Sequence, residues 1–245
     1  WDLADLEQKI MASPLKPRLL LLCNPHNPVG RVWTRDELEQ ILELVIRYDL
    51  WVCSDEIHCD LVLDQRCKHI PFASLNAEAA KRTLTLMAPS KTYNIAGLNC
   101  AFAITSNPEI RAKLAKIMHG LFSDINIFGI AACQAALTQG GAWRGELLDY
   151  LRINRDLVLS ELANLAGLKV TIPEATYLAW IDGRELCAKY QLANLQQFFE
   201  VAGVGLSDGA DFANAGFVRL NFGTNRAILV EALQRMRLAV ANIIK

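Results

Sequence analysis

RLLLLCNPHNPVG, at residues 18–30, joins a short apolar run to a turn that is rich in asparagine and proline. The run at residues 18–23 is too short for a typical helix, and its length predicts a buried strand. The residues of the turn, 24–30, favour tight backbone reversals over regular structure. Beyond the turn, Thr34 and Glu37 form the pattern of a capping box, which predicts a helix with one apolar stripe.

Further apolar runs continue this alternation along the first half of the chain. Residues 51–54 predict a second strand that ends at Asp55, and residues 83–87 predict a third that ends shortly before Lys91. A fourth strand is expected at residues 100–104. Strands separated by a helix at this spacing are typical of parallel βαβ units. We therefore predict an α/β fold with a mostly parallel sheet and flanking helices.

The second half of the chain has longer helical patterns between short, dispersed strands, which is typical of a smaller α+β domain. We place the boundary near Trp143, so that residues 1–142 belong to a large domain and residues 143–245 to a small one. The expected helices of this half lie at residues 108–119, 127–138, 143–165 and 225–244, and the expected strands at 169–172, 177–181 and 217–222.

The composition of the chain argues against several classes of function. The 245 residues are 52% hydrophobic with a formal net charge of −1, which argues against a nucleic-acid partner. No apolar run is long enough to span a membrane. The seven cysteines are odd in number and contain no C-x-x-C pair, which favours a reducing, cytoplasmic compartment. Cys53, His58 and Cys59 lie close in sequence, but no second ligand pair follows, so we expect no metal site.

Three polar residues lie at or just after the ends of the predicted strands: Asn27, Asp55 and Lys91. Open α/β sheets bind their ligands at this edge. Each residue also has an ordinary explanation, since a carboxylate after a strand often caps a helix and a lysine is usually a solvated surface charge. An amide, an acid and a lysine at one edge suit a phosphorylated heterocyclic aldehyde as ligand.

Four motifs resemble the class I/II aminotransferase family of fold type I. They are NPVG at residues 27–30, SDEIH at 54–58, SKTYNIAGL at 90–98 and FVRLNFG at 217–223. Together with TYLAWID at residues 176–182, the second and third motifs are most similar to the subgroup of C–S lyases that resemble cystathionine β-lyase. The resemblance covers nearly the whole chain.

The resemblance implies pyridoxal 5′-phosphate as cofactor and a role for each matching residue. Lys91 is expected to hold the cofactor as a Schiff base and then to remove the substrate's α-proton. Asp55 is expected to pair with the pyridine nitrogen, and Asn27 to donate a hydrogen bond to the ring oxygen. Arg219 is expected to bind the α-carboxylate of a small amino-acid substrate with its bidentate fork.

Some positions depart from the family pattern. His58 stands where many relatives have a tyrosine that contacts the cofactor, and either this role or that of a buried structural histidine is possible. Ala88 and Asn99 stand where many relatives have a serine and an arginine that bind the phosphate, so Ser90 is the remaining candidate for that contact. Residues 206–209 replace a proline-glycine turn that often precedes the last strand.

The resemblance also implies that the chain lacks an N-terminal part, because Lys91 precedes the midpoint here whereas its counterpart in full-length relatives lies well past it. That part is expected to supply a phosphate cradle at a helix N-terminus and part of a homodimer interface.

Three functions remain open. The first is a C–S lyase that converts cystathionine or cysteine-like substrates to pyruvate, ammonia and a thiol, for which the apolar residues 177–181 are a candidate thioether surface. The second is an aminotransferase, and the third is an inactive fragment that serves as a binding module.

Overall fold

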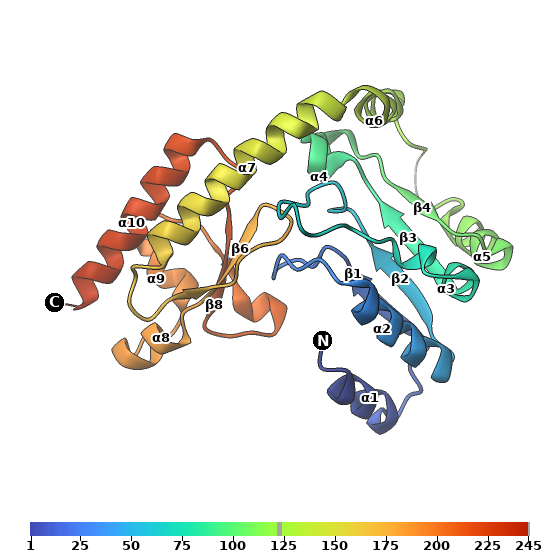
Figure 1. The fold of residues 1–245 in the computed structure, drawn as a ribbon, viewed down its shortest axis with the longest axis horizontal. Coiled ribbons are helices and arrows are strands. Elements are labelled where there is room, and N and C mark those ends of the chain that lie inside the picture. The colour runs from blue at the N-terminus through green and yellow to red at the C-terminus, as the bar shows by residue number, and fades with distance from the viewer. Residues whose placement is uncertain (122–123, 245) are drawn as a thin grey trace. The chain divides into compact units, whose positions relative to one another are not determined.

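The computed structural model describes residues 1–121 and 124–244, which form two compact units (Figure 1). None of the described helices is both long enough and apolar enough to cross a membrane. The first unit comprises Trp1–Pro25, Val32–Val62 and Arg66–Arg144, and the second comprises His26–Arg31, Leu63–Gln65 and Gly145–Lys245.

The first unit is built on a four-stranded sheet in the order β1 (Leu19–Cys23), β2 (Trp51–Asp55), β3 (Thr83–Met87) and β4 (Phe102–Ile104). The first three strands are parallel, as predicted, and β4 is antiparallel to β3. Asp55 lies in register with the last residue of β1 and with Leu86 near the end of β3. The carboxyl ends of the three parallel strands therefore meet at one edge.

Helix α2 (Arg35–Arg47) confirms the predicted capping box, in which Thr34 and Glu37 each bond the backbone of the other. The first unit contains further helices, most of them short. They are α1 (Leu3–Ala12), η1 (Phe72–Ser74), α3 (Ala77–Arg82), α4 (Ser90–Tyr93), η2 (Ala96–Leu98), α5 (Pro108–Met118) and α6 (Ile127–Gln139).

The core of the first unit lies on one face of this sheet. The apolar stripe of α2, with Leu38 and Ile41 fully buried, packs on this face together with Leu22 and Val52. The prediction that β1 is buried is wrong for its other face. Leu19 and Leu21, which lie on that face, are 54% and 72% exposed. Side chains of a strand alternate between its faces, and the described residues cover only one face of β1.

The second unit contains an antiparallel sheet in the order β5 (Lys169–Val170), β6 (Leu178–Asp182), β8 (Phe217–Asn221) and β7 (Ser207–Asp208). The sequence did not indicate β7. The helices of this part of the chain are α7 (Gly141–Leu162), α8 (Arg184–Tyr190), α9 (Leu195–Val201), η3 (Gly209–Phe212) and α10 (Arg226–Ile244).

The second unit also includes two short segments from the first half of the chain, His26–Arg31 and Leu63–Gln65. Gly30 O accepts hydrogen bonds from Glu174 N and Ala175 N, both at 2.9 Å. Gly30 has a φ of +78°, and an added Cβ would lie 2.9 Å from Pro173 Cβ. Only glycine suits this turn, because it combines a left-handed backbone with a close backbone approach.

Candidate active site

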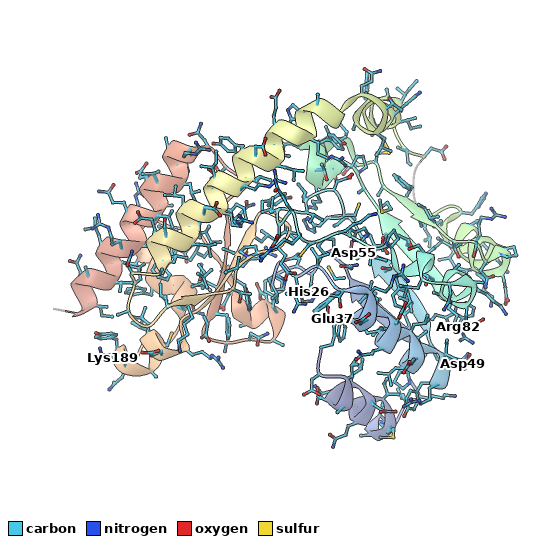
Figure 2. The ribbon with its side chains drawn as sticks, in the orientation of Figure 1. His26, Glu37, Asp49, Asp55, Arg82 and Lys189 are labelled. Carbon is cyan, nitrogen blue, oxygen red and sulfur yellow. The ribbon has the colours of Figure 1, made fainter. Side chains whose placement is uncertain are left out.

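Asp55, which is labelled in Figure 2, is the last residue of β2. Its backbone is held by hydrogen bonds on both sides. Asp55 O accepts from Asn24 N at 3.0 Å, and the next amide, Glu56 N, donates to Leu86 O at 3.0 Å. Asp55 Oδ1 accepts from Ile57 N at 3.2 Å. In the described parts of the chain this carboxylate has no ion-pair partner, so its negative charge remains available to a ligand.

Lys91 belongs to the short helix α4, which begins four residues before Asn94 and directly follows the loop after β3. Asn94 ends this helix in the left-handed conformation, and its amide donates to Ser90 O. Lys91 is exposed, and its ammonium group forms no hydrogen bond or ion pair within residues 1–121 and 124–244. Because β2 and β3 are parallel neighbours, Asp55 and Lys91 follow strands that end at the same sheet edge.

His58 and Cys59 lie in the turn after β2. His58 is 4% exposed, which is compatible with either of the roles considered for it. Burial raises the pKa of the Cys59 thiol to about 12, with smaller contributions from the charges of Asp60 and Glu56. The thiol is therefore protonated at neutral pH. Among the described residues, no group of three possible ligands is placed to hold a metal ion.

The second unit joins Asn27 and Arg219, which are 192 residues apart in the sequence. Arg219 Nη1 donates to Asn27 Oδ1 at 2.9 Å, and Nη2 donates to Ser207 Oγ at 3.0 Å. The guanidinium carbon lies 4.8 Å from the centre of the Phe212 ring. These partners are uncharged, so they orient the guanidinium without neutralising it.

Burial lowers the pKa of Arg219 from its ordinary value, although nearby Tyr177 and Asp211 act in the opposite direction. Within the described residues no carboxylate forms an ion pair with Arg219. A partly buried, oriented guanidinium without a carboxylate partner is suited to bind a carboxylate from outside the chain.

Sequence reasoning missed Ser207 and Phe212. The only signal was that residues 206–209 replace the proline-glycine turn of many relatives. In the structure these residues form β7 and the start of η3, and Asp208 caps η3 by accepting from Ala210 N. The candidate thioether surface needs a correction, because Leu178 to Ile181 are at most 5% exposed and form the core of the second unit. Tyr177 alone in that stretch is partly exposed.

Comparison with known proteins identifies the family. A family model described as aminotransferase class I and II matches residues 1–236. The chain belongs to this family. The match spans the strand ends that carry Asp55 and Lys91 as well as the strand that carries Arg219.

Within this family the chain is similar to a cystathionine beta-lyase, to a protein described as a C–S lyase and to OvoB. It is 39% identical over 247 residues to cystathionine beta-lyase PatB of Bacillus subtilis, covering 98% of this chain and 62% of PatB. A crystal structure of OvoB superposes with a TM-score of 0.92 at 48% identity, covering 96% of this chain and 61% of that one. The C–S lyase of Staphylococcus hominis, solved with pyridoxal phosphate bound, has a TM-score of 0.90 at 32% identity, covering 98% and 62%. The chain thus spans about three fifths of the length of these relatives.

Proposed function

We propose that this chain is part of a pyridoxal-phosphate-dependent C–S lyase that acts on a small amino acid by α,β-elimination. The observation that carries the proposal is the pair Asp55 and Lys91, whose charged groups follow neighbouring parallel strands at one sheet edge and have no ion-pair partner in the described chain. The similarity to PatB and to the Staphylococcus hominis lyase favours carbon–sulfur cleavage within the family.

The donor set suits this cofactor. A pyridine ring needs an anionic partner at its nitrogen, which the Asp55 carboxylate supplies, and an aldehyde needs an amine, which Lys91 supplies. The backbone bonds on both sides of Asp55 hold the carboxylate in place before the ligand binds. When bound, pyridoxal phosphate supplies an electron sink for negative charge at the substrate's α-carbon.

The side chains of this chain have separate roles in substrate binding and proton removal. Arg219, oriented by Asn27 and Ser207, binds the substrate's α-carboxylate and sets the direction of the Cα–H bond. Lys91 Nζ, once free, accepts the α-proton as general base. The Asp55 carboxylate would pair with the ring nitrogen and so stabilise the charge that develops on proton loss. Asn27, His58 and Ser90 are proposed as further cofactor contacts.

The lyase and aminotransferase alternatives share proton removal by Lys91 and differ in the step after it. A lyase expels the β-substituent, and a thiolate leaves readily because a thiol is far more acidic than an alcohol. A transaminase instead releases a keto acid made from the substrate and needs a second keto acid to complete its cycle. Dicarboxylate transaminases also need a second carboxylate-binding arginine, which we do not identify in this sequence.

Incubation of the complete protein with cystathionine and no keto acid tests this choice. We expect release of pyruvate and a thiol, with slower transamination as a side reaction. The pyruvate is measured with lactate dehydrogenase and the thiol with a chromogenic disulfide. If pyruvate is absent and amino transfer is brisk once a keto acid is added, the protein is an aminotransferase.

A conservative change at Arg219 tests the substrate contact. Arg219→Lys removes the planar fork and cannot keep the bonds to both Asn27 and Ser207. Since a hydrogen bond to a charged group contributes about 1.5–3 kcal/mol, we expect KM to rise about ten-fold or more. Steady-state kinetics separate KM from kcat, and an unchanged KM would place the carboxylate elsewhere.

We also propose a cytoplasmic homodimer. The seven cysteines all lie within the described residues and none of them is in a disulfide, which agrees with a reducing compartment. Large apolar side chains are exposed on α6 and just before it, and such patches are typical of interfaces. They include Leu121, Ile127 and Phe128, which are 71–74% exposed. Light scattering coupled to size-exclusion chromatography measures the mass of the assembly.

A further inference from the structure

Directly after Asp55 the chain buries a second carboxylate, that of Glu56, which is 1% exposed. Ser54 Oγ donates to Glu56 Oε1 at 2.8 Å, so these two side chains lie on the same side of β2. Val52 and Ser54 face the core beneath α2, and Asp55, which alternates with them, faces the other side. Glu56 can therefore act on Asp55 only through the backbone.

Three hydrogen bonds satisfy the Glu56 carboxylate. Oε1 accepts from Ser54 Oγ and also from Phe72 N at 3.0 Å, while Oε2 lies 2.9 Å from His69 Nε2. A carboxylate oxygen accepts, so the contact is a hydrogen bond in the form of His69 that carries a proton on Nε2. The His69 side chain is 11% exposed, so the contact is shielded from water on both sides. A buried carboxylate needs such partners in place of the water that it loses.

These contacts attach residues 69–72 to the end of β2, and Asn24 attaches the same segment to the end of β1. Asn24 Nδ2 donates to Ile70 O at 3.2 Å, and Asn24 N donates to Asp55 O at 3.0 Å. Two buried polar side chains, Asn24 and Glu56, thus connect this segment to the backbone on either side of Asp55.

We propose that Glu56, together with His69, is a positioning residue that fixes the Asp55 carboxylate at the sheet edge. The inference rests on the proposed function, in which Asp55 carries the charge that the cofactor needs. Loss of the Glu56 carboxylate frees residues 69–72 and leaves buried donors unsatisfied on Ser54 and Phe72. The backbone at Asp55 then gains freedom, and its carboxylate spends less time in the orientation that Ile57 N holds.

Two substitutions and one control test the role. Glu56→Ala removes all three acceptor contacts. Glu56→Gln keeps an oxygen for Ser54 and Phe72, and its amide N–H can donate to His69 in the histidine's other tautomer. Val45→Ala is the control, because Val45 is fully buried on α2 in the same core and forms none of these polar contacts.

Two quantities are measured for each of these variants, and the variants are compared with their losses of unfolding free energy taken into account. The first is the hydrogen exchange of the Ile57 amide in cofactor-free protein, and the second is the Kd for pyridoxal phosphate. For Glu56→Ala we expect faster Ile57 exchange and a Kd raised about ten-fold, as is typical for partners that orient a ligand-binding group. Glu56→Gln is expected to recover most of both, and Val45→Ala to change neither.

Equal changes in Glu56→Ala and Val45→Ala would overturn the inference, since Glu56 would then contribute to stability alone. A different result would contradict the proposed function, namely that borohydride traps no cofactor on the wild-type protein. The Ile57 exchange still decides the positioning role then, because it is measured without cofactor.

Discussion

Lys91→Ala is expected to abolish covalent attachment of pyridoxal phosphate and to reduce turnover by at least about 10²–10⁴-fold, the contribution of a positioned general acid or base. The substitution removes the amine that both holds the cofactor and accepts the α-proton. The measurement is kcat with cystathionine, together with the absorbance of the protein-bound cofactor before and after borohydride reduction.

Lys113→Ala is the matched control for this experiment. Lys113 is also exposed on a helix of the first unit, but it forms an i,i+4 ion pair with Glu109 and lies in the middle of α5, which follows the antiparallel strand β4. Its loss should leave turnover and absorbance at wild-type values, because an exposed pair of this kind contributes little to stability. Lys91→Ala with turnover close to wild type would exclude Lys91 as the reactive amine.

Asp55→Ala is expected to retain some cofactor while lowering kcat by about a hundred-fold or more, the usual effect of removing a group that stabilises developing charge. Lys91 would still hold the cofactor covalently, but the variant would lack the anionic partner that Asp55 provides for the ring nitrogen. Rapid-mixing measurement of α-proton removal isolates the affected step from substrate binding and product release.

Asp55→Asn separates the charge of this residue from its shape. An asparagine oxygen can still accept from Ile57 N, so the local backbone should be preserved. The negative charge is gone, and we expect the rate to fall nearly as far as in Asp55→Ala. A loss of only a few-fold in either variant would be too small for the role assigned to Asp55.

Local sequence signals predicted the parts of the fold that depend on local chemistry. The capping box at Thr34 and Glu37 marks the start of α2 because its two hydrogen bonds involve only neighbouring residues. The strand ends at Asp55 and Met87 were predicted closely, since polar residues interrupt the apolar runs there. The position of Asp55 and Lys91 at one edge then follows from the parallel pairing of β2 and β3.

Features that depend on distant parts of the chain were not predictable in this way. The direction of β4 and the pairing of β7 with β8 are set by tertiary contacts rather than by local pattern. The uncharged partners that orient Arg219 come from two distant stretches of the chain, at residue 27 and at residues 207–212. The motif resemblance identified Arg219 itself, but the spacing of the sequence could not distinguish a binding cleft from an exposed sheet surface.

The central claim is that Lys91 binds pyridoxal phosphate covalently at the sheet edge where Asp55 lies. Peptide mapping by mass spectrometry, after borohydride reduction of the cofactor-loaded protein, tests it most directly. We expect one reduced cofactor adduct per chain, located on Lys91, with none on Lys81 or Lys113. An adduct on another lysine, or no adduct in protein that has been saturated with cofactor, would contradict this account.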